Sequence, residues 1–147
     1  MHYNINYVNG TLTISAKSLT VTASAQSKTY GATAPTTGTL NTNFTVTGLL
    51  NTDAASSATL SYSGTTAGNL ATAAVGSYTI TPSALTLSTG STSNYSITYA
   101  TGTLTVTTAA LTITGVTANN KTYDGTTTAT LSGTAAYSGL QNGESFT

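Results

Sequence analysis

The sequence is poor in charge and lacks several residue types. It contains no cysteine and no tryptophan, and only three basic and three acidic side chains among its 147 residues. Charged residues make up 4% of the chain, whereas about a quarter of an average soluble domain is charged. The absence of cysteine excludes disulfides and thiolate metal sites. A net charge of zero argues against nucleic acid as a partner, because nucleic acid binding needs a basic patch. No apolar run approaches the ~18 residues of a membrane span.

Threonine is instead the most frequent residue, and nine tyrosines supply most of the aromatic surface. Threonine is β-branched and favours strands. Apolar residues alternate with Thr and Ser in segments such as Leu19–Ala23, Tyr78–Ile80 and Leu104–Val106. A period of two places the apolar residues on one face of a strand. The pattern therefore predicts an ordered all-β protein.

An internal repeat sets the domain organisation. Residues 3–23 are similar to residues 95–115 at a constant offset of 92 residues. Lys28-Thr-Tyr-Gly31 likewise corresponds to Lys121-Thr-Tyr-Asp124. A period near ninety residues is about the length of one small β-sandwich domain and is far longer than a solenoid coil.

The repeat divides the chain into three parts. Residues 1–16 are expected to be the closing hairpin of a preceding repeat, residues 17–107 a complete β domain, and residues 108–147 the N-terminal part of another. Gly10 and Gly102 occupy the same position between two strand patterns, which predicts a tight hairpin turn with a glycine at positive φ. The connections between the parts are only a few residues long, which predicts a stiff end-to-end array.

The predicted fold is a tandem array of immunoglobulin-like β-sandwich domains. One segment, residues 51–57, is compatible with a helical turn, because Asn51 or Thr52 could cap it and Asp53 would lie in its first turn. If that turn were a true helix, a β-grasp-like fold would be the alternative.

Five motifs in order resemble the MBG domain of the YGX type over residues 19–107. The motifs are Leu19–Ala23, Lys28–Gly31, Gly48-Leu49 with Asp53, Gly76–Ile80 and Asn94–Tyr99. Residues 111–147 resemble the first half of a YDG domain, whose naming motif is Tyr123-Asp124-Gly125. Two features depart from these families: Ala32 stands where an acidic residue usually follows the Tyr-Gly, and the closing strands of the YDG domain are absent. The resemblance implies a large bacterial surface protein, such as a filamentous-haemagglutinin-like adhesin, and a secreted or cell-surface location. It implies no catalytic residues.

The residues themselves predict no catalytic, cofactor-binding or metal-ligating site. Asp53 and Asp124 fall in different domains, so they do not form the carboxylate pair of a glycosidase. His2 is the only histidine, which argues against a nucleophile triad. Asp124-Gly125 is interpreted as a tight turn anchored to the core by Tyr123, and not as a calcium loop, which needs several carboxylates.

Two further features were candidates for chemistry. Tyr95 and Tyr99 alternate on one strand face, where they are expected first to fill the core margin and second to contact a glycan. Lys28 and Asp53 could supply two of the three groups of an intramolecular isopeptide cross-link. We expect Lys28 instead to pack its stem beside Tyr30 and to leave its amine in water.

The function predicted from these observations is that of a structural stalk or fibre segment in a bacterial extracellular adhesin or matrix filament. The alternative is a repeat module that binds a glycan or a host protein. The expected partners are neighbouring repeats or copies of the same chain, with surface glycans or host proteins as the second class. An enzyme is not expected, and no cofactor is.

Overall fold

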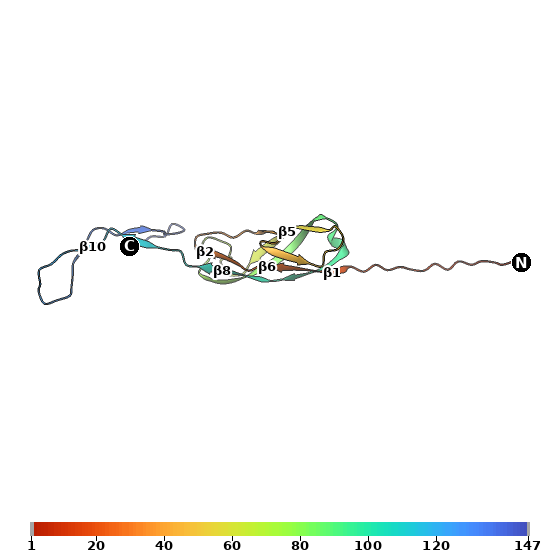
Figure 1. The fold of residues 1–147 in the computed structure, drawn as a ribbon, viewed down its shortest axis with the longest axis horizontal. Coiled ribbons are helices and arrows are strands. Elements are labelled where there is room, and N and C mark those ends of the chain that lie inside the picture. The colour runs from red at the N-terminus through yellow and green to blue at the C-terminus, as the bar shows by residue number, and fades with distance from the viewer. Residues whose placement is uncertain (1, 147) are drawn as a thin grey trace.

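The computed structural model describes residues 2–146, and almost all of its regular structure is β-strand (Figure 1). The elements in chain order are β1 (Lys17–Ala23), β2 (Gln26–Thr29), β3 (Thr37–Thr39), β4 (Phe44–Thr47), β5 (Ala54–Tyr62), β6 (Gly76–Thr89), the 3₁₀ turn η1 (Thr92–Asn94), β7 (Tyr95–Ala100), β8 (Gly102–Thr107), β9 (Thr112–Thr114), β10 (Thr117–Ala118), β11 (Leu131–Ser132) and β12 (Ala136–Ser138). The all-β class predicted from the alternating pattern is confirmed.

Two sheets enclose the core of residues 17–107, which we call the central unit. One sheet has the order β4-β1-β7 and the other the order β2-β8-β6-β5-β3. One core cluster brings Leu19 and Val21 of the first sheet together with Leu85 of the second, and Phe44 is completely buried within it. The alternating residues of β1, β5 and β8 thus point inward, as the period of two predicts. Immunoglobulin-like topology stays a prediction beyond this two-sheet arrangement.

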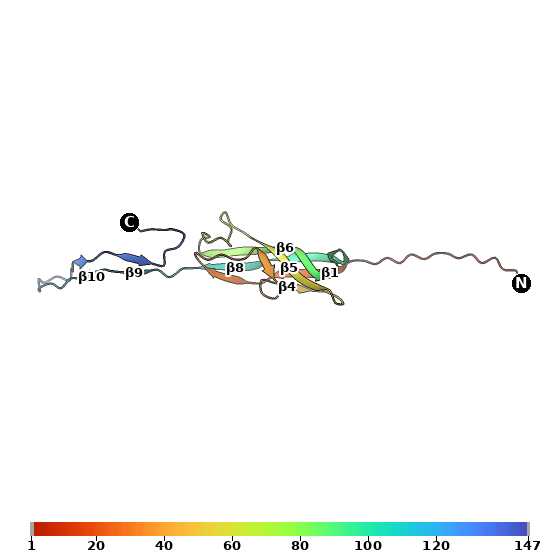
Figure 2. The same cartoon turned by 90° about the horizontal axis from the view of Figure 1, so that it is seen from above.

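The first and last strands of the central unit run side by side in the same direction. β1 pairs with β7 in parallel, from Lys17 opposite Tyr95 to Thr22 opposite Ala100. β2 pairs with β8 in parallel at the same relative register, with Lys28 opposite Val106. The chain therefore enters and leaves the central unit at opposite ends of its long axis (Figure 2).

The predicted hairpin at Gly102 is wrong. β7 and β8 lie in different sheets, so the chain crosses between sheets at this point beside the parallel crossing from β1 to β2. Gly102 has no positive φ. A Cβ there would lie 2.5 Å from the carbonyl oxygen of Ala23, so glycine is needed because two backbones approach closely at the crossing.

The predicted helical turn at residues 51–57 is also wrong. Residues 51 and 52 form a turn, in which Asn51 has a φ of 57°, and β5 begins at Ala54. A left-handed residue cannot continue a right-handed helix. No α-helix occurs within residues 2–146, so the β-grasp-like alternative, which depended on that helix, is not supported.

Residues 108–146 form a second, thinner unit, which we call the C-terminal unit. β9 pairs with β12, with Thr112 opposite Ser138 and Ile113 opposite Tyr137. This pairing reproduces that of β1 with β4, where Val21 stands opposite Val46. The C-terminal unit therefore begins with the same strand pair as the central unit, although Ile113 is 59% exposed.

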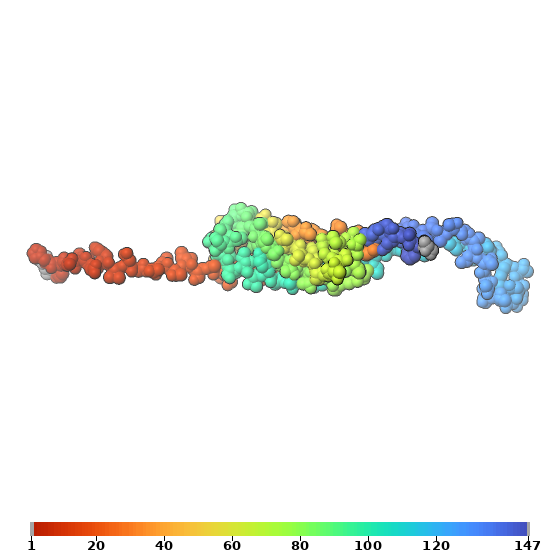
Figure 3. Space-filling view, turned by 180° about the vertical axis from the view of Figure 1, so that it is seen from behind, coloured from red at the N-terminus to blue at the C-terminus, as the bar shows by residue number. Residues whose placement is uncertain are grey.

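Residues 2–16 form no strand and are exposed throughout. They extend from the central unit as a single thin chain (Figure 3). The predicted hairpin is therefore not formed by this segment. Its apolar residues, among them Tyr7 and Leu12, face solvent, because neither sheet of the central unit receives them as a strand.

Candidate inter-unit interface

The two units meet where the chain leaves the central unit. Tyr30 follows β2 directly, and its backbone N–H donates to the carbonyl oxygen of Thr107 at 2.8 Å. Because Thr107 is the last residue of β8, this bond holds Tyr30 beside the connection to the C-terminal unit. The hydroxyl of Tyr30 then donates across the junction to Oε1 of Glu144 at 2.5 Å. Hydrogen bonds to an ionised carboxylate are among the stronger ones in proteins.

Two further contacts lie beside this bond. The carbonyl oxygen of Ala71 accepts from the backbone N–H of Gly31 at 3.1 Å and from Nδ2 of Asn142 at 3.2 Å. Gly31 has a φ of 91°, and a Cβ there would lie 2.3 Å from Oε1 of Gln141. Glycine at this position therefore serves both the backbone conformation and the approach of the neighbouring unit.

An apolar cavity of about 220 Å³ completes the interface. Val75 of the central unit and Leu111, Leu140 and Phe146 of the C-terminal unit line it, together with Tyr30. The dark blue segment of the C-terminal unit adjoins the central unit in the space-filling view (Figure 3). Apolar side chains from both units share this cavity, but Val75, Leu111 and Phe146 remain 55%, 41% and 57% exposed, so the cavity adds little apolar burial to the hydrogen bonds.

The sequence pointed to only part of this interface. Tyr30 and Gly31 belong to the Lys28–Gly31 motif, but the sequence does not predict their contact with residues 139–144. Gln141 and Asn142 were missed. A usable signal existed, because residues 139–144 follow residues 48–53 at a constant offset of 91 residues, which marks them as a repeated loop.

Lys28 supports the same end of the central unit from inside. Its side chain is buried, and its Nζ donates to the carbonyl oxygens of Ala32 and Leu70. The prediction that its amine lies in water is therefore wrong. Burial lowers the pKa of Lys28, because desolvation disfavours the charged form. These two bonds link the turn that contains Gly31 and Ala32 to the loop that contains Leu70.

Asp53 has a different partner. Its Oδ2 accepts from the hydroxyl of Tyr95 at 2.6 Å, and that hydroxyl accepts from the N–H of Leu50 at 3.1 Å. The hydrogen bond to Asp53 raises the pKa of Tyr95. Lys28 and Asp53 thus each have other partners, which gives no support to the cross-link.

The two tyrosines predicted as glycan contacts differ in exposure. Tyr95 is only 8% exposed, so little of its ring is left for a sugar to stack on. Tyr99 is 37% exposed, and its hydroxyl accepts from the N–H of Leu85 at 3.1 Å. Tyr95 therefore has the position at the core that was expected first for both tyrosines. A glycan contact stays a prediction, and among the two residues it now rests on Tyr99.

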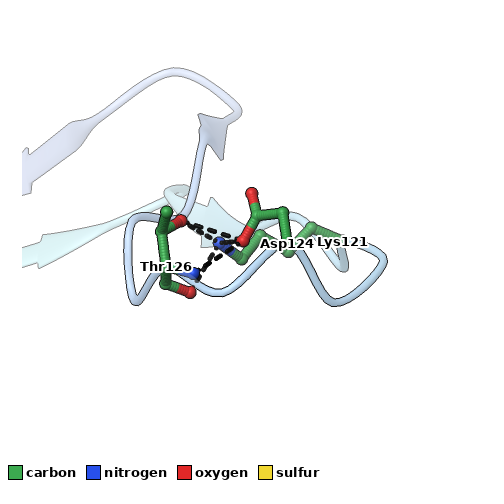
Figure 4. A network of polar contacts seen from close by, with 3 residues as sticks. All are labelled: Lys121, Asp124 and Thr126. Atoms are coloured by element: carbon green, nitrogen blue, oxygen red, sulfur yellow. Dashed lines mark hydrogen bonds and ion pairs between the residues drawn. The ribbon is translucent and has the colours of Figure 1, made fainter.

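The loop at Asp124 is a tight turn, as interpreted from the sequence (Figure 4). Oδ1 of Asp124 accepts from the N–H of Thr126 at 3.0 Å and from Nζ of Lys121 at 2.8 Å. These contacts lower the pKa of Asp124, with the bond from Lys121 as the largest cause. Gly125 has a φ of 74°, as such a turn requires. Tyr123, however, is 93% exposed, so its predicted role as an anchor to the core is wrong.

Within residues 2–146, no three or more His, Cys, Asp and Glu side chains are placed to hold a metal ion. No helix in the described part of the chain is long and apolar enough to cross a membrane.

Comparison with known families fits this two-unit organisation. The family model of the MBG domain (YGX type) matches residues 19–105. The chain belongs to the MBG domain family. The model of the YDG domain matches residues 107–147, so the central unit is the MBG domain and the C-terminal unit carries the YDG similarity. The tandem suspected from the sequence motifs is confirmed.

The two families also limit the functional class. MBG and YDG domains are found in extracellular proteins that contain repeats, and neither is known as a catalytic family. No curated protein and no solved structure matches the chain.

Proposed function

We propose that the chain is a load-bearing segment of a bacterial extracellular stalk or fibre, in which domains of this type follow one another end to end. The observation that carries the proposal is the interface around Tyr30 and Glu144. It joins consecutive units by side-chain hydrogen bonds and a shared apolar cavity, across only the few residues between β8 and β9.

Strand pairing inside the MBG domain supports the same role. Because β1 and β2 run parallel to β7 and β8, the chain ends of the domain lie at opposite poles. Tension along the axis would then shear the two parallel pairs, and all their hydrogen bonds would bear the load together. An antiparallel pair pulled from one end opens one bond at a time.

Single-molecule pulling tests this directly, since the sequence contains no cysteine and attachment points can be introduced at will. We expect a higher unfolding force through residues 17 and 107 than through residues 17 and 47, where β4 would peel from β1. Equal forces in the two directions would contradict a load-bearing role.

The second candidate function is a glycan-binding repeat, and the partial exposure of Tyr99 is the observation that favours it. A glycan array with the full chain separates the two functions. Saturable binding that a Tyr99→Ala variant loses would favour the binding module. We expect no such binding if the chain serves as a stalk.

A further inference from the structure

The loop of residues 139–144, which contacts the MBG domain, has a counterpart inside that domain at residues 48–53. Gly48 has a φ of 108° and Gly139 one of 104°. Asn51 and Asn142 are likewise both left-handed, with φ of 57° and 52°. Non-glycine residues are uncommon in this region, so the two loops share an unusual conformation at these two positions. They differ at the next residue, since Gly143 has a φ of 75° and its counterpart Thr52 has no positive φ.

The hydrogen bond that closes the loop is also the same. The N–H of Asp53 donates to the carbonyl oxygen of Leu50 at 3.1 Å, and the N–H of Glu144 donates to that of Gln141 at 2.9 Å. Both loops therefore end with a carboxylate after a turn that the equivalent hydrogen bond closes. The carboxylate of Asp53 accepts from Tyr95 of its own domain, whereas that of Glu144 accepts from Tyr30 of the neighbouring unit.

Each loop packs at the start of its own unit, on β1 in the MBG domain and on the residues just before β9 in the C-terminal unit. A Cβ on Gly48 would lie 2.6 Å from the carbonyl oxygen of Ser18, and one on Gly139 would lie 2.3 Å from that of Ala110. Ser18 and Ala110 are equivalent at the repeat offset of 92 residues. Each loop is thus held at the end where the chain enters its unit.

Within residues 2–146, only the loop of residues 139–144 contacts another unit. Gln141 lies against Gly31, and Glu144 accepts from Tyr30. At the position of Gln141 the MBG domain has Leu50, which is 49% exposed. An exposed leucine on a loop of fixed conformation is a surface of the kind that partners cover.

The connectivity indicates what covers it. Residues 3–15 repeat the sequence of residues 95–107, which form β7 and β8 in the MBG domain. Thr107, at the end of β8, holds Tyr30 through a backbone bond. A unit closed by residues 3–15 would hold its own Tyr-Gly element beside Ser15, the equivalent of Thr107, next to the 48–53 loop.

We infer that the loop of residues 48–53 is the docking site for the Tyr-Gly element of a preceding repeat of the same kind. This inference deepens the proposed function and rests on it. Each unit would present a Tyr-Gly element where the chain leaves it and a Gly-Leu-x-Asn-x-acid loop where the chain enters. Contact between the Tyr-Gly element of one unit and the loop of the next would give consecutive units the same relative orientation at every junction.

A tandem chain tests the inference. Residues 17–94 are placed before residues 3–147, so that residues 3–15 can close the added unit. Proper folding of that unit is first checked by the gain of β-strand signal in circular dichroism. The absence of native cysteine then allows spin labels to be attached in pairs and distances to be measured by pulsed electron resonance.

Two label pairs compare the junctions in the same molecule. One pair joins Ser27 of the MBG domain to Ser138, across the junction seen in the structure. The other joins the added unit's copy of Ser27 to Thr47, the equivalent of Ser138; all of these positions are exposed. We expect two narrow distance distributions with the same mean. A narrow distribution at the first junction and a broad one at the second would overturn the inference alone, whereas broad distributions at both would overturn the stiff array itself.

Thiol protection provides a second measurement. In the tandem chain the Leu50→Cys change is placed only in the second copy, the one that follows the added unit. This thiol should react with a maleimide about tenfold more slowly than the same thiol in the single chain, because docking covers it. Thr47→Cys should react at the same rate in both chains. Equal rates for Leu50→Cys in both chains would contradict the inference.

Discussion

Tyr30 and Glu144 belong to consecutive units, and the hydroxyl of the first donates to the carboxylate of the second at 2.5 Å. Tyr30 is itself fixed to the last strand of its unit through Thr107. A short chain of bonds therefore leads from the MBG domain into the next unit without passing through the covalent connection. This second link fixes the angle between the two units, since a flexible linker alone restrains their distance and not their relative orientation.

Tyr30→Phe should loosen this junction. The change removes the bond to Glu144 while keeping the ring in the cavity, and it should cost about 0.5–1.5 kcal/mol of docking free energy. We expect the distance distribution between spin labels at Ser27 and Ser138 to broaden. Tyr7→Phe is the matched control, because Tyr7 is 84% exposed and its loss of a hydroxyl should leave the distribution unchanged. An equally narrow distribution in Tyr30→Phe would show that the bond to Glu144 is not needed to set the orientation.

Gly102→Ala should destabilise the MBG domain. The added methyl would meet the carbonyl oxygen of Ala23 at 2.5 Å, and relief of such a clash costs about 1–3 kcal/mol. Gly10 is its repeat equivalent and has nothing within 4 Å of its Cβ position, so Gly10→Ala is the control and should not destabilise. Urea unfolding of both variants measures the difference. A similar loss in the two variants would mean that the close crossing of backbones is not what requires glycine.

The contrast between Gly10 and Gly102 also shows what the sequence could predict. Alternation identified the strands and their inward faces, because period two depends only on local geometry. The partners of each strand depend on contacts far apart in the chain, so a glycine between two strand patterns was interpreted as a hairpin when it is a crossing between sheets. Tyr123 was misjudged for a similar reason. Its equivalent, Tyr30, is held by β8, and the pattern around Tyr123 does not reveal whether such a strand lies beside it.

The interface was the least predictable part. Tyr30 and Glu144 are 114 residues apart, and no local pattern connects residues at such a separation. The repeat nevertheless contained the necessary information. Gly139, Asn142 and Glu144 have the same spacing as Gly48, Asn51 and Asp53, and this match identifies two copies of one loop before any contact is known.

Lys28→Met should destabilise the MBG domain by about 1–2 kcal/mol, because the carbonyl oxygens of Ala32 and Leu70 would lose their donor. Lys17→Met is the control, since Lys17 is exposed. Equilibrium unfolding of both variants measures the effect. Wild-type stability at or below that of Lys28→Met would indicate that desolvation of the amine outweighs its two bonds.

The same lysine predicts a dependence on pH. The pKa of Lys28 is lowered by burial, so the unfolded chain binds the proton more tightly than the folded domain does. Its contribution to stability should therefore increase as the pH rises from the lowered pKa of the folded domain toward about 10.4, the ordinary value. The measurement is the difference in unfolding free energy between wild type and Lys28→Met across this range. A difference that shrinks with rising pH would contradict the assignment.

Tyr95→Phe should lower the thermal stability of the MBG domain. The change removes the bond to Asp53 and leaves the N–H of Leu50 without its acceptor. Loss of about one net hydrogen bond corresponds to about 4–8 °C in Tm for a domain of this size. Tyr123→Phe is the control, because Tyr123 is 93% exposed. Equal Tm values for the two variants would show that the bond to Asp53 contributes nothing.

Acid should open the turn at Asp124. Lys121 holds the pKa of the Asp124 carboxyl below its usual range, so the folded turn favours the carboxylate. A lowered pKa stabilises at pH values above the ordinary one, about 3.9, and this contribution disappears as the pH falls through the lowered value. The amide signals of Gly125 and Thr126, followed by NMR during an acid titration, should change together with the carboxyl signal of Asp124. In Asp124→Asn the pH-dependent change of these two amides should be absent, since an amide does not titrate. If the same change persisted in that variant, the turn would depend on a group other than Asp124.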